Sequence, residues 1–413
     1  MNKTPGATTP PDLGRRDDHS EPMRVLAITT GYPGDHNPTE AIFIRTQCEA
    51  LNSAGVAVEV LSLRPWVPPG FARWQARWRC YQRTPRYYEL NSIPVHRPRY
   101  FAPPRSDLWA SPHRAYVRQA RKIFTRPPDV IHAHFAYPCG LAAIRLAQKW
   151  GAPAVITLHG TDTNDFPYRT RRSANRFREA IGAADEVVAV SQALAKRAAD
   201  LSGRMAKVIP IGLDLKRFGN LPDRTEARRR LGLPPDAAII LYVGRLLETK
   251  GVRELLTALA RMQERRVLGL FIGAGPLEDE IAAASRCRCV GLQPNERIPL
   301  YMRAADLLVL PSHAEGMPTV LVEAGAVGLP VVSTAVGGIP ELLDDGRGHL
   351  VPPHSVEDLR KSVEQVLAHP HSAAESSARL RAFVLARYDA RRCVAELLEV
   401  YQSLRARNSA AAP

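Results

Sequence analysis

The chain has 413 residues, 45% of them hydrophobic, and its formal net charge at pH 7 is +15. This length is two to three times that of a common domain, so we expect two domains. No apolar run is long enough to cross a bilayer as a helix, which argues against a transmembrane protein.

The amino-terminal stretch and the cysteines bear on where the chain works. Residues 1–22 are rich in Pro, Thr and charge and lack the apolar stretch of a signal peptide, so we expect a disordered tail. The six cysteines are scattered, and only Cys287 and Cys289 are close, without a nearby His or further Cys. We therefore expect reduced cytosolic thiols rather than disulfides or a zinc site.

Short apolar strands alternate with helices after the tail. Strands are predicted at residues 24–29, 56–63, 129–134, 154–159 and 186–191, with helices at 39–54 and 140–150. The pattern begins again with strands at 238–244, 267–273, 307–311 and 330–334, a helix at 252–263, and a last amphipathic helix at about 391–404. This alternation predicts two α/β units with parallel, doubly wound sheets, joined near residues 205–225.

The polar residues and glycines of interest fall where predicted strands end. In open parallel sheets, ligands bind beyond the carboxyl ends of the strands. The residues at these ends are His134, His159, Ser191, Gly244, Gly273 and Ser312. Two such units facing each other would form a cleft, and we expect the site there.

Positive charge is concentrated between residues 64 and 126. This segment holds fourteen Lys or Arg against only Glu89 and Asp107, a local charge of +12. A local excess of this size predicts a local partner of negative charge.

A predicted helix inside this basic segment places aromatic rings on one face and arginines around them. The residues are Phe71, Arg73, Trp74, Arg77 and Trp78. This composition is typical of a helix that lies in an anionic membrane interface. Two alternatives are binding of single-stranded nucleic acid and a solvated basic face whose aromatic rings pack on the first domain.

Residues 243–251, VGRLLETKG, form a turn between a predicted strand and a predicted helix. Gly244 and Gly251 permit close backbone approach, while Arg245 and Lys250 place positive charge at the same loop. A diphosphate would suit such a loop. The alternative is a helix amino-terminal turn that carries two surface cations.

A second glycine turn, FIGAGP at residues 271–276, also connects a strand to a helix. It lacks the third glycine of a dinucleotide-binding fingerprint, and Pro276 follows Gly275. The turn therefore lies beside a nucleotide or serves only as a tight connection.

The stretch HAEGMPTVLVE, residues 313–323, places Glu315 in a loop and Glu323 in the helix that follows. Pro318 is expected in the first helical turn, where its missing N–H costs nothing, and the free amides of that turn attract phosphate. Carboxylates would repel a diphosphate, so we interpret both glutamates as acceptors for ribose and sugar hydroxyls. The alternative is one helix-capping and one solvated glutamate.

The histidines and Ser191 allow fewer conclusions. His159 would face the cleft, but a lone histidine is more often a satisfied structural residue. His132 and His134 alternate on one strand face without a third ligand, which argues against a metal site. Ser191 resembles a helix cap rather than a nucleophile, because no Asp–His pair is visible for it.

Together, GRLLETKG, GAGP, HAEGMPTVLVE and the HGTD of residues 159–162 resemble the retaining glycosyltransferases of family 4. The resemblance extends over residues 23–405 and includes the early stretch GYPGDHNPTEAIFIRTQCEAL, which resembles members that build bacterial surface polysaccharides. It implies a GT-B fold: an acceptor domain at residues 23–208, a donor domain at 209–385 and a helix at 386–405 that crosses back to the first domain.

The resemblance also implies roles for named residues. The catalytic set would be His159, Arg245, Lys250 and Glu315. The donor would be held by Gly244, Arg245, Lys250, Gly273, Gly275, Gly316, Met317, Pro318, Thr319 and Glu323. Arg245 and Lys250 would contact the diphosphate, so neither a metal ion nor another cofactor is expected.

Two positions depart from the family pattern. Ala41 stands where the family often has Gly in the early loop, and Ile211 stands where it often has Asn in the interdomain segment. Neither change removes a catalytic group, but Ala41 affects the expected loop conformation and acceptor fit.

The function implied is transfer of a hexosyl group from a UDP- or GDP-linked sugar to a glycan or a polyprenyl-diphosphate-linked acceptor, with retained anomeric configuration. We expect the protein in the cytoplasm, peripherally bound to the anionic inner face of the plasma membrane, without nucleic acid. Alternatives are a nucleotide-sugar epimerase of the same two-lobed fold and a non-catalytic binding protein.

Overall fold

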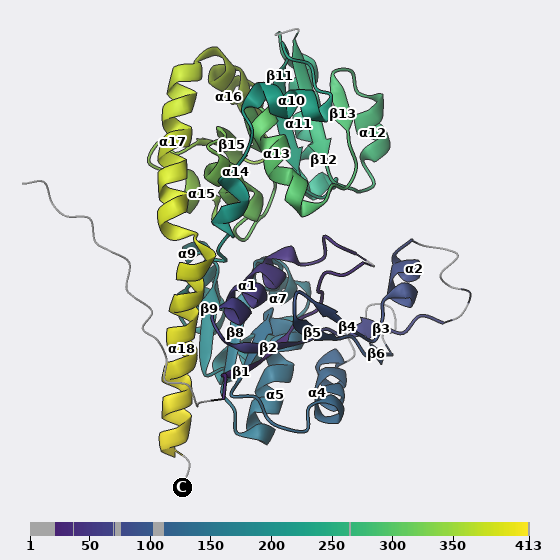
Figure 1. Cartoon of the computed structure of the whole chain (residues 1–413), viewed down its shortest axis with the longest axis vertical. Helices are drawn as coiled ribbons and strands as arrows, with labels where there is room; N and C mark the ends of the chain where they lie inside the picture. The colour runs from purple at the N-terminus through teal and green to yellow at the C-terminus, as the bar shows by residue number, and fades with distance from the viewer. Residues whose placement is uncertain are drawn as a thin grey trace, which may run out of the picture.

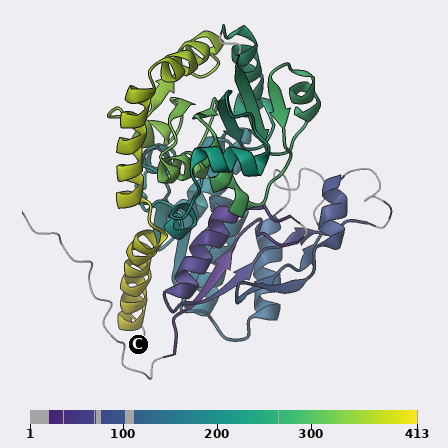
Figure 2. The same cartoon turned by 45° about the horizontal axis from the view of Figure 1, so that its top comes forward.

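A computed structural model of the chain describes residues 21–35, 37–68, 70, 76–101, 111–263 and 266–411. Figures 1 and 2 show two lobes, each built around its own β-sheet. The described strands form an eight-stranded sheet, a six-stranded sheet and the short pair β3–β6. Among the described residues, none of the helices combines the length and the hydropathy that crossing a lipid bilayer requires.

The first sheet has the strand order β10-β9-β8-β7-β1-β2-β5-β4, and only β4 runs antiparallel to its neighbour. Its strands are β1 (Arg24–Ile28), β2 (Ala57–Leu61), β4 (Tyr87–Leu90), β5 (Ile93–His96), β7 (Val130–His134), β8 (Ala154–Leu158), β9 (Glu186–Ala189) and β10 (Lys207–Val208). The remaining elements of this lobe are β3 (Arg64–Pro65), β6 (Arg99–Tyr100), α1 (Ile42–Ser53), α2 (Ala76–Arg83), α4 (Pro112–Ile123), η2 (Ala136–Gly140), α5 (Leu141–Trp150), α6 (Thr161–Asn164), α7 (Phe166–Arg169), α8 (Arg171–Ala183) and α9 (Gln192–Ser202).

Strand β1 is apolar and buried from Val25 to Ile28 because both of its faces are covered. Leu26 and Ile28 belong to one core with α4, α5, α8 and α9, while Val25 and Ala27 belong to another with α1 and α18. A parallel strand buried on both faces reads as a continuous apolar run rather than an alternating one.

The second sheet has the strand order β13-β12-β11-β14-β15-β16 and is parallel throughout. Its strands are β11 (Ala238–Val243), β12 (Val267–Ile272), β13 (Cys287–Cys289), β14 (Leu307–Leu310), β15 (Val331–Thr334) and β16 (His349–Val351). The helices of this lobe are η3 (Leu215–Phe218), α10 (Arg224–Leu231), η4 (Glu248–Lys250), α11 (Val252–Arg261), α12 (Glu278–Ala283), η5 (Asn295–Arg297), α13 (Ile298–Ala304), α14 (Thr319–Val327), α15 (Ile339–Leu343), α16 (Val356–Ala368) and α17 (Pro370–Arg387).

The last helix, α18 (Ala390–Ala411), leaves the second lobe and lies along the first (Figure 1). Val394, Leu397, Tyr401 and Leu404 form its buried stripe and pack into the core beneath β1. Each fully buried side chain of this size contributes roughly 1.5–3 kcal/mol. The helix is therefore an integral part of the first lobe, although it follows the second lobe in the chain.

The two chain segments that connect the lobes, at Leu213 and at residues 388–390, are hydrogen-bonded to each other. The amide of Leu213 donates to the carbonyl of Tyr388 at 2.7 Å, and the amide of Ala390 donates to the carbonyl of Leu213 at 3.0 Å. A Cβ on Gly212 would lie 2.2 Å from Cα of Ala390, so only glycine permits this approach.

The basic segment, for which the charge count predicted a local partner of negative charge, does not lie entirely on the surface. Arg64 and Arg97 are among the most buried side chains, at 2% and 1% exposure. Arg97 donates to the carbonyl of Tyr32 at 2.9 Å and to Glu40 at 3.0 Å, and Arg64 donates to the carbonyl of Arg97 at 3.3 Å. Part of the excess charge therefore has internal partners.

The structure describes only the later part of the predicted aromatic helix, as α2 from Ala76 onward. Phe71, Arg73 and Trp74 lie outside the described residues. Arg77 and Trp78 belong to α2, but their side chains are outside the described part as well. The hairpin of β4 and β5, which follows α2, was not predicted from the sequence.

Candidate functional site

The loops that follow strands of both sheets meet between the two lobes. A Cβ on Gly160, which follows β8, would lie 3.0 Å from Cα of Gly316, which follows β14. A Cβ on Gly316 would lie 2.2 Å from the carbonyl oxygen of His159. Asn164 donates from Nδ2 to the carbonyl of Glu315 at 3.0 Å. Glycine at both positions therefore lets the two backbones touch, and residues predicted separately for each domain become neighbours.

Lys250 and Glu315 form an ion pair at the edge of the second sheet. Their Nζ and Oε1 atoms are 2.6 Å apart, and the side chains are only 20% and 13% exposed. The pair joins η4 to the loop before α14. Glu315, which was interpreted as a hydroxyl acceptor, is thus paired with Lys250, which was assigned to the diphosphate.

Gly251 fixes the position of this lysine. It has a φ of 69°, and a Cβ there would lie 1.9 Å from the carbonyl oxygen of Pro311. Any other residue would push η4 away from the end of β14. Arg245 lies in the same loop and is exposed, and its guanidinium has no ion pair or hydrogen bond among the described residues.

The two glycine turns are packed against each other. A Cβ on Gly273, at φ 149°, would lie 1.8 Å from the carbonyl oxygen of Gly244, and one on Gly275 would lie 2.3 Å from that of Leu246. These two glycines therefore have a structural reason to be glycine. A Cβ on Gly244 itself would meet only the Tyr242 hydroxyl, at 3.1 Å.

Helix α14, which lies within the stretch HAEGMPTVLVE and beyond it, begins one residue later than expected. Pro318 has φ −73° and ψ 115° and precedes α14, whose first residue is Thr319, so the prediction that Pro318 occupies the first helical turn was wrong. Its extended ψ cannot continue a helix. The amides of Thr319 and Val320 still lack partners within the helix, whereas the amide of Leu321 donates to the carbonyl of Pro318 at 3.1 Å. Met317 packs against the cores of both lobes.

Glu323 lies inside α14 and is buried, with 8% exposure. This burial rules out the solvated glutamate considered from the sequence. The carboxylate has no hydrogen-bond partner among the described residues. Burial raises the pKa of Glu323 to about 7, and the positive charge of Arg217 acts in the opposite direction. A buried carboxylate of this kind is suited to accept hydrogen bonds from a ligand.

His159 belongs to a row of three imidazoles on the first lobe. His134 and His159 are hydrogen-bonded through Nδ1 and Nε2 at 3.0 Å. The neighbouring His132 is bonded to Thr157 at 2.7 Å and to Tyr401 at 2.6 Å. Loss of hydration lowers the pKa of His159 below its ordinary value and that of His132 to about 3.

These neutral imidazoles serve as hydrogen-bonding groups rather than charges. His159 also contacts the rings of Phe43 and Phe135, whose centroids each lie 4.9 Å from its own. The imidazole is thus held in one orientation.

The loop before α1 has a left-handed backbone conformation at Ala41, the position where the family often has glycine. Ala41 caps α1 with φ 50° and ψ 43°, in the left-handed region that favours glycine. An alanine there costs roughly 1–2 kcal/mol. The adjacent Glu40 is held by buried Arg97, so the loop keeps this shape despite the alanine. The sequence offered no signal for this contact.

A second contact between the lobes was also missed. Glu341, in α15, accepts hydrogen bonds from the amides of Gln192 and Ala193 at 2.8 and 2.6 Å. These amides open α9, which Ser191 caps through the amide of Leu194, as the sequence predicted. A carboxylate at a helix amino terminus is favourable, so Glu341 fastens the second lobe to the first.

Two hollows lie away from these loops. A cavity of about 1290 Å³ lies where β11, β14 and β15 begin, opposite to the ligand-binding edge of such a sheet. A groove of about 560 Å³ lies between α4 and α5 and is strongly basic. Its lining residues are His113, Arg114, Val117, Arg118, Arg121, Lys122, Arg145 and Lys149.

Comparisons with known proteins agree over both lobes. Residues 41–217 match the family model for Glycosyltransferase Family 4, and residues 223–407 match that for group 1 glycosyl transferases. A Bacillus subtilis (strain 168) protein, named as a teichuronic acid biosynthesis glycosyltransferase, is 36% identical over 386 residues, which are 92% of this chain and 99% of that protein. The D-inositol 3-phosphate glycosyltransferase 2 of Catenulispora acidiphila is 34% identical over 60% of this chain and 64% of its own length.

Solved structures share the arrangement of the lobes. HepE of Anabaena, crystallised with UDP, superposes with a TM-score of 0.70 at 20% identity, over 92% of this chain and 100% of that one. Sucrose-phosphate synthase of Thermosynechococcus elongatus superposes with a TM-score of 0.74 at 24% identity, over 93% and 99%. At these identities the likeness concerns the fold.

Proposed function

The chain belongs to glycosyltransferase family 4 and has the GT-B fold, and on this basis we propose that it transfers a hexosyl group from a nucleotide-diphosphate sugar with retained anomeric configuration. The observation that carries the proposal is the Lys250–Glu315 pair at 2.6 Å, beside exposed Arg245, at the carboxyl edge of the second sheet. Structures of the Anabaena protein with UDP and with UDP-glucose support a donor of this class.

The diphosphate would take the position between Arg245, Lys250 and the amino end of α14. The two cations and the free amides would stabilise the negative charge that develops on the leaving diphosphate. The positive charge at the leaving group would come from these two side chains and the amides, without a metal ion or other cofactor. Glu315 would accept from hydroxyls of the donor sugar, and the buried carboxylate of Glu323 would accept from the ribose hydroxyls.

The reaction would proceed on one face of the sugar. The bond between the anomeric carbon and the diphosphate oxygen breaks, and the acceptor oxygen bonds to the same face. The acceptor proton passes to the departing diphosphate. A retaining hydrolase needs two carboxylates about 5 Å apart, whereas Glu315 is already neutralised by Lys250. His159, neutral and fixed by His134, would position the sugar through a hydrogen bond.

The acceptor would be a glycan or a polyprenyl-diphosphate-linked sugar for a bacterial surface polysaccharide. The full-length similarity to the Bacillus subtilis protein named for teichuronic acid biosynthesis supports this class. We place the protein in the cytoplasm, at the anionic inner face of the plasma membrane. The basic groove between α4 and α5, together with the aromatic segment at residues 71–78, would contact that surface.

The transfer is tested with a panel of nucleotide sugars. Donors that raise the melting temperature of the full chain would be incubated with lipid-linked acceptors, and NMR would give the anomeric configuration of the product. We expect one nucleotide class to stabilise the protein and the product to retain the donor configuration. An inverted product would contradict the mechanism, and free sugar or an epimer without transfer would contradict the function.

Membrane contact is tested by sedimentation with anionic vesicles at low salt. The triple variant Arg118→Ala, Arg121→Ala, Lys122→Ala should pellet less than the wild type, because it removes charge from the groove. The variant Arg229→Ala, Arg253→Ala, Lys361→Ala removes the same number of cations from the second lobe and should pellet normally. Equal pelleting of the two variants would argue against a role for the groove.

A further inference from the structure

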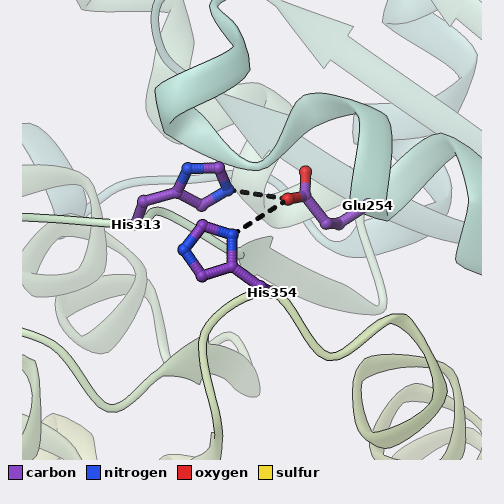
Figure 3. A group of neighbouring side chains, drawn as sticks. All are labelled: Glu254, His313 and His354. Atoms are coloured by element: carbon purple, nitrogen blue, oxygen red, sulfur yellow. Dashed lines mark hydrogen bonds and ion pairs between the residues drawn. The ribbon is translucent and has the colours of Figure 1, made fainter.

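Glu254 and His354 lie close to His313, the first residue of the stretch HAEGMPTVLVE, although the three residues are far apart in the sequence (Figure 3). Glu254 lies in the first turn of α11, His313 follows β14, and His354 follows β16. Nε2 of His313 is 2.7 Å from Oε1 of Glu254, and Nδ1 of His354 is 3.6 Å from the same oxygen. All three ligand atoms lie within 4.8 Å of one another.

These distances are close to those of a metal site. Zinc bonds to imidazole nitrogen and carboxylate oxygen at about 2.0–2.2 Å, so neighbouring ligand atoms of a tetrahedral site lie roughly 3.3 Å apart. The 3.6 Å separation already fits this requirement. The 2.7 Å hydrogen bond would have to lengthen by less than about 1 Å, which small side-chain rotations provide.

The burial of the Glu254 carboxylate is a further observation that favours a bound cation. Oε2 of Glu254 is buried and has no hydrogen-bond partner in the part of the chain that the structure describes. Such an orphaned carboxylate oxygen costs free energy unless a proton, a hydrogen bond or a cation satisfies it. His354 adds a second sign of constraint, because its backbone has a φ of 64°, which is rare for a residue other than glycine.

The donor types narrow the choice of cation. Mg²⁺ and Ca²⁺ prefer several oxygen ligands, whereas two imidazoles with one carboxylate are typical of zinc and its first-row neighbours. The side chains of Glu254 and His313 are 17% and 18% exposed, but that of His354 is 63% exposed, which leaves a path for the ion and for a water ligand. We propose that Glu254, His313 and His354 bind a divalent transition-metal ion, with zinc as the best match.

The ion would join α11 to the loops that follow β14 and β16, at the edge where the donor is proposed to bind. The amide of His313 donates to the carbonyl of Thr249 at 3.0 Å. Lys250, the next residue after Thr249, pairs with Glu315, two residues after His313. The ion would therefore hold the Lys250–Glu315 pair in place. It acts by positioning and takes no part in the leaving-group step.

The test uses Co²⁺ as the probe, because tetrahedral Co²⁺ absorbs visible light. The untagged full chain would be stripped with a chelator and titrated with Co²⁺, and Zn²⁺ would then displace it. We expect one equivalent to bind and to raise the melting temperature. His354→Ala, at an exposed position that tolerates truncation, should weaken binding at least tenfold, and Glu254→Gln should weaken it as well.

His371→Ala is the matched control. His371 is 91% exposed and lies 3.5 Å from Glu375 on α17, so it represents an ordinary surface His–Glu pair. Its removal should leave Co²⁺ affinity unchanged. Equal affinity in the wild type and His354→Ala, or absence of a tetrahedral Co²⁺ spectrum, would overturn the proposal. Because no sugar is present, either result leaves the transferase proposal standing.

Discussion

The hydroxyl of Tyr401 lies 2.6 Å from Nδ1 of His132, and this hydrogen bond links α18 to the row of histidines that ends at His159. Both groups are buried, and Nε2 of His132 is occupied by Thr157 at 2.7 Å. The imidazole row that ends at His159 is thus supported by a helix that arrives from the other lobe.

Tyr401→Phe should destabilise the protein by about 1–3 kcal/mol, because it leaves a buried imidazole nitrogen without a partner. Urea denaturation measures the loss. Tyr388→Phe is the control and should cost less than about 1 kcal/mol, since among the described residues the Tyr388 hydroxyl donates only to the sulfur of Met317, at 3.8 Å. Equal stability of Tyr401→Phe and the wild type would show that the bond contributes nothing.

Lys250→Ala and Arg245→Ala should each lower kcat by about 10²–10³-fold, as expected when a donor to a developing negative charge is lost. Nucleotide release at saturating donor measures the effect, and circular dichroism checks the fold. Lys361→Ala, an exposed cation on α16, should keep the wild-type rate. Near wild-type turnover in the double variant would refute the assignment of both residues to the diphosphate.

Glu323→Gln should stabilise the protein above neutral pH and weaken donor binding. The pKa of Glu323 is raised from 4.5 to about 7, so the folded state binds the proton more tightly than the unfolded state. The wild type therefore loses stability as the pH rises from about 4.5 to 7, by up to roughly 3 kcal/mol at about 1.4 kcal/mol per unit.

Urea denaturation of the wild type and Glu323→Gln at several pH values isolates this contribution. The two proteins should have similar stability near pH 4.5, and the variant should gain progressively up to pH 7. A difference that does not change with pH would mean that Glu323 is ionised at its ordinary pKa. Donor affinity, measured by calorimetry, should fall in the variant because a hydroxyl acceptor loses its charge.

Gly316→Ala should lower turnover by roughly 10–100-fold, because its Cβ would lie 2.2 Å from the carbonyl of His159 and displace the loop that carries Glu315. Steady-state kinetics and melting temperature measure the effect. Gly182→Ala is the control, since a Cβ there meets nothing within 4 Å and should leave turnover unchanged. Unchanged kinetics in Gly316→Ala would mean that the two lobes need not touch at this point.

Much of the architecture could be predicted from the sequence because it depends on local periodicity. Apolar strands such as Ala154–Leu158 and Ala238–Val243 are continuous runs that helices cover on both faces, and this pattern is legible in any window of the chain. The clustering of Arg245, Lys250 and Glu315 followed from the rule that ligands bind at the carboxyl edge of a parallel sheet. Ser191 as a helix cap followed from its residue type.

Other features depended on contacts between residues far apart in the chain. A charge count cannot distinguish an exposed arginine from Arg64 or Arg97, because burial is decided by the strands and loops that surround them. Likewise, nothing near Glu254 indicates that His354 lies 3.6 Å away. The two sheets and the chemical types at their edges follow from the amino-acid order, since these depend on neighbours along the chain. Which of those groups are paired, which are buried and which remain for a ligand follows from the folded chain, because pairing and desolvation depend on neighbours in space.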